Sequence, residues 1–283
     1  MPELPEVQTA VSQLNRKISG KKISGAWSDW KKKIFPSYPV FARQTRKARV
    51  LGARRFGKHI AIDLDNGYSI VAHLKMTGHF LVKDKKNRHA KAFTEDPINS
   101  YIHHIITFFD GTTLEFSDMR KFGWLRVVKT GGVETFPSIA MLGIDALSPK
   151  LTPQRFRKLF AEKKSRLIGA ALLEQNLIAG IGNIYRNEAL FFANILPMRR
   201  VGTLTGREWE KLHAAIKNVL RNAVKLRGTS VGDFRDTDGL PGNFQHTLYV
   251  YARTKEPCKK CGTMIVRKKI GQRSVFYCSR CQQ

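Results

Sequence analysis

The segment Leu4-Pro-Glu-Val-Gln-Thr-Ala-Val-Ser-Gln-Leu-Asn-Arg-Lys-Ile18 opens the chain with a helical pattern. Apolar residues recur in it at intervals of three and four, which lines one face of a helix. Pro5 suits the first turn, where a backbone N–H has no partner within the helix. The residues of the apolar face are Leu4, Val7, Val11, Leu14 and Ile18. We therefore predict a helix that begins almost at the first residue.

Beyond this helix, from about residue 23 to residue 128, the pattern changes to short alternating runs. Examples are Ile60-Ala-Ile-Asp-Leu64 and Thr113-Leu-Glu-Phe116. Turn signals such as Asp65-Asn66-Gly67 separate the runs, as expected for antiparallel strands. The pattern predicts an antiparallel sandwich or barrel. The charged residues 83–100 show no period and are expected to form an exposed loop within it.

The second half of the chain follows Gly131-Gly132 and is predicted to be mainly helical. Helical periodicity covers residues 156–161, 167–177, 184–193 and 209–226. The segment 228–245 is rich in Gly, Asp, Thr and Ser and has neither a helical nor a strand period. A loop of this length inside a compact domain is usually functional or disordered.

The charge balance points to a polyanionic partner. The chain has 50 Lys and Arg against 22 Asp and Glu, a formal net charge of +28. Such a charge repels itself unless a polyanion is bound, and nucleic acid is the common one. The alternative is a general solubilising or membrane-surface charge. No segment approaches the ~18 apolar residues of a membrane span, so we expect a cytoplasmic, nucleoid-associated protein without a membrane partner.

Cysteines occur only near the C-terminus, as Cys258-x2-Cys261 and Cys278-x2-Cys281. This spacing is typical of four thiolates that close a tetrahedron around zinc. A redox dithiol pair or buried free thiols are the alternative. Four protein ligands leave no open coordination position, so we expect one structural Zn²⁺ and chemistry elsewhere.

Several ordered motifs span nearly the whole chain. They are Met1-Pro-Glu-Leu-Pro-Glu-Val7, Gly57-Lys58, His73-Leu-Lys-Met-Thr-Gly78, Asp118-Met-Arg-Lys-Phe-Gly123, Leu172-Leu-Glu-Gln-Asn-Leu-Ile-Ala-Gly-Ile-Gly-Asn-Ile-Tyr185, Gly228-Thr-Ser230, Pro241-Gly-Asn-Phe-Gln245 and the four-cysteine segment. Together they resemble the motifs of bacterial formamidopyrimidine-DNA glycosylase, a bifunctional glycosylase and AP lyase.

The resemblance implies an α+β fold of three domains. An N-terminal helix and antiparallel β-sandwich would form a catalytic domain at residues 1–132. A helical, helix-two-turns-helix DNA-binding domain would occupy residues 133–246, and a four-cysteine zinc finger residues 247–283.

Pro2 is the candidate nucleophile. Removal of Met1 would leave a secondary α-amine, and α-amines titrate near ~8, well below lysine. Taken alone, Pro2 is better explained as a residue that simply starts a helix; the other motifs favour the nucleophile. By resemblance Glu3 is the general acid/base, Lys58 a proton donor and phosphate contact, and Arg273 takes part in the last elimination step. Glu6 is expected to orient Glu3 or the amine, with compensation of the helix dipole as the alternative.

Removal of a base from duplex DNA requires the nucleotide to be flipped out and the gap to be filled. Met76, Arg120 and Phe122 match the residues that fill it in the family. By resemblance Lys164 and Asn183, with Arg273, hold backbone phosphates, and the loop 228–245 closes over the flipped base. The chain departs from the family at Tyr101, which replaces a DNA-contacting histidine, at Met119, where proline is common, and at Gly169, where lysine is frequent.

These inferences predict a monomeric glycosylase and AP lyase that acts on oxidised purines, 8-oxoguanine opposite cytosine and formamidopyrimidines, in damaged double-stranded DNA. Two alternatives remain: a related endonuclease VIII-like glycosylase for oxidised pyrimidines, and a catalytically silent DNA-binding paralogue. The sequence Leu4-Pro-Glu-Val7 favours the purine enzyme. The presence of Pro2, Glu3 and Lys58 argues against a catalytically silent protein.

Overall fold

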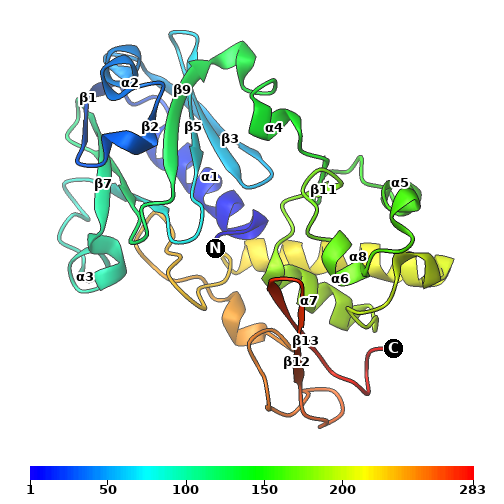
Figure 1. The fold of residues 1–283 in the computed structure, drawn as a ribbon. Helices are drawn as coiled ribbons and strands as arrows, with labels where there is room; N and C mark the ends of the chain where they lie inside the picture. Colours follow the sequence, from blue (N-terminus) through cyan, green and yellow to red (C-terminus); the bar gives the residue numbers. More distant parts are fainter. The chain divides into compact units, whose positions relative to one another are not determined.

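The computed structural model describes residues 1–283, which form two compact units. The first contains Met1–Ala140 and Leu226–Gln245, and the second contains Met141–Lys225 and His246–Gln283. Figure 1 labels the elements of both units. The three domains expected from the sequence, at residues 1–132, 133–246 and 247–283, stay a prediction beside these two units.

The first unit contains two β-sheets. One has the strand order β1-β7-β8-β6 and the other β2-β9-β5-β4-β3. All pairs are antiparallel except the short β2–β9 pair, which is parallel. The elements are α1 (Leu4–Ile18), β1 (Ile23–Ser28), β2 (Ile34–Phe35), α2 (Tyr38–Thr45), β3 (Val50–Phe56), β4 (His59–Leu64), β5 (Tyr68–His73), β6 (His79–Lys83), α3 (Lys91–Thr94), β7 (Ile102–Phe108), β8 (Thr113–Ser117), β9 (Trp124–Lys129) and α4 (Pro137–Ala140).

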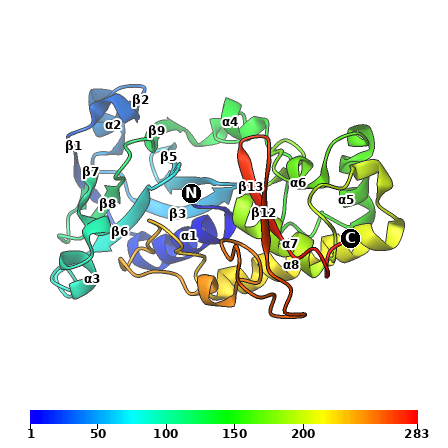
Figure 2. The ribbon, with the colours of Figure 1, turned by 60° about the horizontal axis from the view of Figure 1, so that its bottom comes forward.

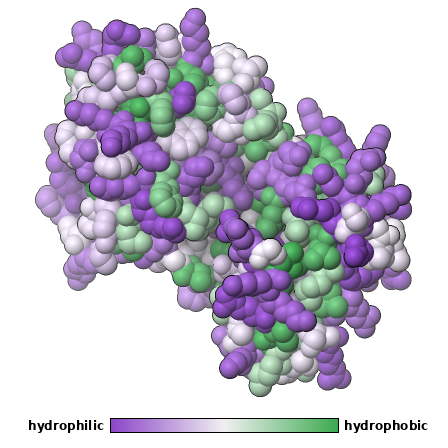
Figure 3. Space-filling view, in the orientation of Figure 1, coloured by the Kyte–Doolittle hydropathy of each residue, from purple (hydrophilic) through white to green (hydrophobic).

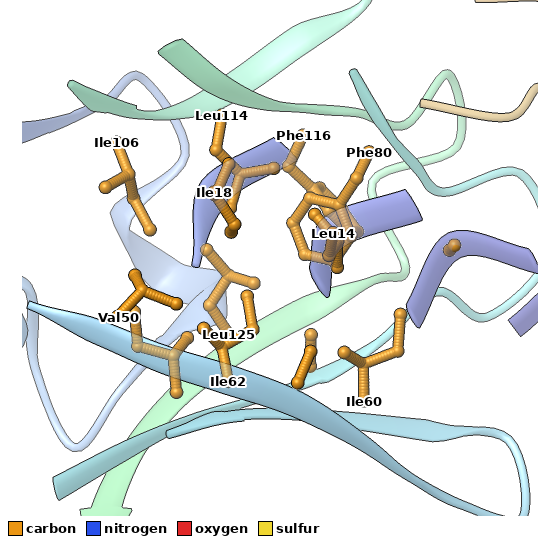
Figure 4. Packing of buried hydrophobic residues seen from close by; sticks show 14 of the residues in the cluster. Leu14, Ile18, Val50, Ile60, Ile62, Phe80, Ile106, Leu114, Phe116 and Leu125 are labelled. Atoms are coloured by element: carbon orange, nitrogen blue, oxygen red, sulfur yellow. The ribbon is translucent and has the colours of Figure 1, made fainter. Parts of the chain in front are cut away.

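The apolar face of α1 packs into the core between the two sheets. Leu14 and Ile18 share one buried cluster with Ile60 of β4 and Phe116 of β8. Figure 4 shows the two helix side chains between strands of both sheets. Burial of one aliphatic side chain of this size contributes about 1.5–3 kcal/mol. The predicted helix and its apolar stripe are confirmed, and this packing holds α1 against both sheets.

Residues 83–100 are more ordered than the expected exposed loop. They contain α3 and a 3₁₀ turn at Pro97–Ser100. Phe93 is buried, and the Asn99 side chain donates to the Gly239 carbonyl at 3.0 Å. One apolar and one polar anchor dock the segment without producing a periodic pattern that sequence inspection could detect.

The second unit is helical with a C-terminal β-hairpin. Its elements are β10 (Ile144–Asp145), α5 (Pro153–Leu159), α6 (Ile168–Ala171), β11 (Ile178–Ala179), α7 (Asn183–Phe192), α8 (Gly206–Lys225), β12 (Val266–Ile270) and β13 (Arg273–Tyr277). The hairpin strand β13 lies against α7, as both ribbon views show (Figures 1 and 2). This packing explains why the finger belongs to the helical unit.

One predicted helix of this unit is much shorter than expected. The periodicity of residues 167–177 gives only α6, followed by turns. Gln175 explains the break, because its side chain accepts from Gly180 N–H at 3.0 Å and donates to the Ile181 carbonyl at 2.9 Å. Such side-chain bonds offer the backbone an alternative to the helix.

Hydrophilic residues predominate on the faces of both units that Figure 3 shows. No helix combines the length and apolar character needed to cross a membrane.

Candidate functional site

The start of α1 brings Pro2, Glu3 and Glu6 together. Pro2 precedes the helix, Glu3 is its N-cap residue, and both are buried. Glu6 lies one turn on and is 1% exposed. Its Oε2 accepts from the Glu3 backbone N–H at 2.7 Å, which fixes the backbone of the residue beside Pro2. Met1 is 43% exposed.

Glu6 also contacts a segment remote in sequence. Its Oε1 accepts from the Thr229 N–H at 2.6 Å. Gly228 approaches so closely that an added Cβ would lie 2.5 Å from Glu6 Oε1, and its φ of +80° is one that L side chains rarely adopt. Only glycine fits both conditions. The carboxylate therefore joins the helix start to the loop at residues 228–245, a contact that sequence reasoning did not find.

A polar face of α1 binds the rest of this loop. Gln13 donates to Asp236 at 3.0 Å and accepts from the Thr237 N–H at 2.8 Å. One turn further, Lys17 forms an ion pair with Asp238 at 2.5 Å. With Glu6 these residues follow a spacing of seven and four, so the loop covers one helix face. That polar repeat was the available sequence signal.

The middle of the loop is tied to the ordered 83–100 segment. Arg235 forms an ion pair with Asp96 at 2.6 Å, and both side chains are largely buried. Asp236 is fully buried and pairs with Arg227 at 3.1 Å. The ends and middle of the loop are thus all held within the first unit.

Lys58 lies in the β3–β4 turn beside a cluster of rings. His59, His73 and Trp124 are register partners on β4, β5 and β9. The rings of His59 and His73 meet edge-to-face, 4.6 Å apart. Burial lowers the pKa of His73 to about 2, assisted by the charges of His59, Lys75 and Lys58. Burial also lowers the pKa of His59 to about 4.

Both imidazoles are therefore neutral near pH 7. Lys58 is 8% exposed and lies next to this neutral pair. The two histidines were absent from the sequence-based candidates, although His73 begins one of the quoted motifs.

Two loops carry the residues that are expected to fill the gap left by a flipped nucleotide. The loops are joined by hydrogen bonds. Met76 lies half-buried in the turn after β5, and Arg120 and Phe122 lie between β8 and β9. The buried Asp118 carboxylate accepts from the Thr77 hydroxyl of the first loop. It also accepts from the Gly123 N–H of the second loop at 2.7 Å. The two loops are consequently held together through Asp118.

Exposed apolar and cationic side chains project from these two loops. Phe122 is 45% exposed. The Arg120 guanidinium lies over its ring, with Cζ 4.7 Å from the ring centroid. Met119 and Tyr101 are also exposed, and the Tyr101 carbonyl accepts from the Asp118 N–H at 2.9 Å. A Phe–Arg pair with flanking apolar side chains has the composition of an intercalating wedge. The structure thus brings Met76, Arg120, Phe122 and Tyr101 together.

The second unit contains the remaining basic and amide candidates. Asn183 is the first residue of α7 and follows a turn with Gly180 at φ +102°. Arg273 is exposed at the start of β13. Lys164 is also exposed and, with Arg157 and Lys158, lines a pocket of about 440 Å³. A helix N-terminus suits anionic phosphate oxygens, but neither Asn183 nor Arg273 lines the pocket beside Lys164.

The departure at Gly169 has a packing explanation. A Cβ there would lie 2.8 Å from the Pro197 carbonyl oxygen and 3.2 Å from Ile270 Cδ1. Gly169 N–H also donates to the Pro197 carbonyl at 3.0 Å. Close backbone approach leaves no room for a lysine side chain at this position.

The four cysteines converge on a zinc site. Their Sγ atoms all lie within 4.8 Å of one another. The Cys258–Cys281 and Cys261–Cys278 separations are 3.9 Å and 3.5 Å. A tetrahedron with Zn–S bonds of ~2.3 Å has edges of about 3.8 Å, so the residues fit one Zn²⁺ with no open position. This site is structural.

Comparisons with known proteins agree with these features. Three family models match: the formamidopyrimidine-DNA glycosylase N-terminal domain at residues 1–125, the formamidopyrimidine-DNA glycosylase H2TH domain at residues 142–235, and the zinc finger found in FPG and IleRS at residues 255–283. The formamidopyrimidine-DNA glycosylase of Pelotomaculum thermopropionicum is 38% identical over 284 residues, which covers 100% of this chain and 99% of that protein.

Solved structures show the same fold. The Lactococcus lactis Fpg in complex with abasic-site DNA has a TM-score of 0.88 and 28% identity, with 99% of each chain covered. MutM in complex with carbocyclic 8-oxo-G DNA has a TM-score of 0.85 and 28% identity, with 100% of each chain covered. The identity to curated relatives over the full length, together with the three matching models, shows that the chain belongs to the formamidopyrimidine-DNA glycosylase family.

Proposed function

We propose that this chain is a bifunctional DNA glycosylase and AP lyase of base excision repair that excises 8-oxoguanine and formamidopyrimidines. The observation that carries the proposal is the buried start of α1, where Pro2 precedes Glu3 and the Glu6 carboxylate fixes the Glu3 backbone. The DNA complexes of relatives, with an abasic site and with an 8-oxoguanine analogue, support it.

Pro2 supplies the nucleophile once Met1 has been removed. Its secondary amine attacks C1′ of the damaged nucleotide, forming a C–N bond as the N-glycosidic bond breaks and its electrons leave with the base. Opening of the sugar ring then gives an iminium. This group withdraws electrons from C2′, so loss of a C2′ proton expels the 3′ phosphate, and loss of a C4′ proton in a second elimination expels the 5′ phosphate.

Proton transfers are assigned to neighbouring side chains. Glu3, beside the nucleophile, delivers a proton to the sugar ring oxygen and can later remove one from the sugar. Glu6 orients the Glu3 backbone and the loop from Gly228. Lys58, next to two neutral imidazoles, contributes a proton or contacts a phosphate.

Recognition of DNA is assigned to both units. In the first, Met76, Arg120 and Phe122 fill the space left by the flipped nucleotide, and Tyr101 contacts the duplex beside them. In the second, the backbone phosphates are held by Lys164, Asn183 and Arg273. The zinc, when bound, supplies only the fold of the hairpin that carries Arg273.

Borohydride trapping tests the nucleophile directly. Reduction of the iminium should yield a covalent adduct with a duplex that contains 8-oxoguanine opposite cytosine. Pro2→Gly should abolish or greatly reduce the adduct. A control variant that keeps one extra residue before Pro2 should also form no adduct, because the proline nitrogen is then part of an amide bond. A full adduct yield from either variant would overturn the mechanism.

A lesion panel decides between the proposal and its alternatives. Faster release of 8-oxoguanine and formamidopyrimidine than of oxidised pyrimidines is expected. The reverse order would indicate an endonuclease VIII-like enzyme, and binding without any adduct would indicate a silent DNA-binding protein.

We propose further that the protein acts as a monomer in the cytoplasm. Light scattering would test the oligomeric state, and fractionation of the producing cells would test the location.

A further inference from the structure

Three consecutive polar residues of α7 are completely buried. Arg186, Asn187 and Glu188 are each 0% exposed. Arginine and glutamate are almost never fully buried unless they are paired or hydrogen-bonded. Neighbouring residues on a helix point in different directions, so α7 is enclosed on several sides by polar contacts.

Arg186 contacts the first residue of its own helix and two other segments. Its Nη1 donates to the Gly169 carbonyl of α6 at 2.6 Å. Its Nη2 donates to the Asn183 side-chain oxygen at 2.5 Å and to the Ser274 carbonyl of β13 at 3.0 Å. One guanidinium therefore holds α6, the first residue of α7 and the zinc-finger hairpin.

The next two residues strengthen the same connection. Asn187 donates to the Asn183 carbonyl at 2.6 Å and accepts from the Phe276 N–H of β13 at 2.9 Å. The Glu188 carboxylate accepts from the N–H groups of residues 249, 250 and 251 at 2.9–3.0 Å. These bonds join α7 to the finger and to the segment leading into it.

The contacts of Arg186 lie next to two candidate phosphate ligands. Asn183 accepts a hydrogen bond through its side-chain oxygen, which leaves its NH₂ group as the available donor. Arg273 immediately precedes Ser274, whose carbonyl Arg186 holds. We propose that Arg186 is a positioning residue, which sets the Asn183 amide and the Arg273 strand at a fixed separation so that both engage one DNA backbone. The proposal rests on the proposed DNA-repair function.

Arginine is specifically suited to this task. Its planar group presents donors in a fixed fork, whereas the single ammonium of lysine is a point charge. Gly169 contributes by approaching closely enough for its carbonyl to accept the 2.6 Å bond. An ordinary charged side chain at position 186 would not reach three acceptors at once.

A double-mutant cycle tests this role in the full-length, zinc-loaded protein. The probe is a duplex with a tetrahydrofuran abasic-site analogue. Arg186→Met should weaken its binding about tenfold, since each unpaired buried acceptor is costly. Arg186→Lys should stay close to the Met variant. Arg221→Met, which removes the same charge from an exposed position on α8, should change binding little.

The cycle partner is Asn183→Ala. If Arg186 acts by positioning Asn183, the double variant should bind little worse than Arg186→Met alone. Fully additive losses, or wild-type binding by Arg186→Lys, would overturn the proposal. Should Arg186→Met fail to fold, the cycle is run with Arg186→Lys.

Hydrogen exchange gives a readout that does not depend on DNA. In Arg186→Met the Phe276 amide should exchange at least about tenfold faster than in the wild type, while amides of β4 in the first unit stay unchanged. Unchanged exchange at Phe276 would contradict the positioning role. Absence of lesion binding by the wild type would instead refute the proposed function, and the exchange result would still decide the role of Arg186.

Discussion

The carboxylate of Glu6 and the backbone N–H of Thr229 are joined by a 2.6 Å hydrogen bond, although the two residues are 223 positions apart. The other carboxylate oxygen accepts from Glu3, beside Pro2. A single buried side chain thereby fixes both the residue next to the proposed nucleophile and the start of the loop proposed to cover the flipped base.

Replacement of Glu6 by glutamine should therefore disturb its contact with Glu3 or its contact with Thr229. The amide has one oxygen and one NH₂ group, so one of the two backbone N–H donors loses its acceptor, at a cost of about 1–3 kcal/mol. We expect Glu6→Gln to lower the Tm and to slow borohydride trapping about tenfold. The exposed Glu210→Gln serves as the control. A wild-type Tm and trapping rate for Glu6→Gln would contradict this bridging role.

Removal of zinc should weaken DNA binding without removing a catalytic group. The thiolates of the finger organise the hairpin that carries Arg273, and structural zinc contributes directly to folding. Chelation is expected to lower affinity for duplex DNA and to reduce the steepness of its salt dependence, because fewer phosphates are contacted. Restoration of zinc should reverse both changes. An unchanged salt dependence after complete zinc loss would rule out the finger as a phosphate contact.

Acidification should destabilise the fold through its buried histidines. Burial lowers the pKa of His104 from 6.5 to about 4, with a smaller contribution from the charge of His103. Between these values the unfolded chain binds a proton that the folded protein does not, so stability is lost as the pH falls.

Thermal unfolding at pH 7 and pH 5 measures this effect. The Tm of the wild type should fall by about 5 °C more than that of His104→Gln. Replacement of the exposed His89 by glutamine should leave the wild-type dependence intact. Equal pH dependence in His104→Gln and the wild type would show that His104 does not contribute.

Replacement of Gly169 by lysine should destabilise the second unit. Its Cβ would meet the Pro197 carbonyl oxygen at 2.8 Å, and overpacking of this kind costs about 1–3 kcal/mol. Gly169→Lys is expected to lower the Tm, whereas Gly131→Lys, which meets nothing within 4 Å, should not. A Gly169→Lys protein as stable as the Gly131→Lys control would refute the packing explanation.

Local patterns predicted much of the protein. The stripe of α1, the alternating strands, most helices and the two cysteine pairs are each visible within a short stretch of chain. Periodicity failed where side chains compete with the backbone, as Gln175 does after α6, and where one or two anchors order a segment, as Phe93 and Asn99 do.

The sequence by itself thus determined the secondary elements, the zinc ligands and the motifs of the family, because these depend on neighbours in the chain. Only the tertiary structure decided that Glu6, Gln13 and Lys17 bind the loop at 228–245, and that Arg186 joins Asn183 to the finger. These bonds connect residues far apart in sequence. Pairing between such distant polar groups produces no periodic pattern in the sequence. The contacts therefore form only when the chain folds.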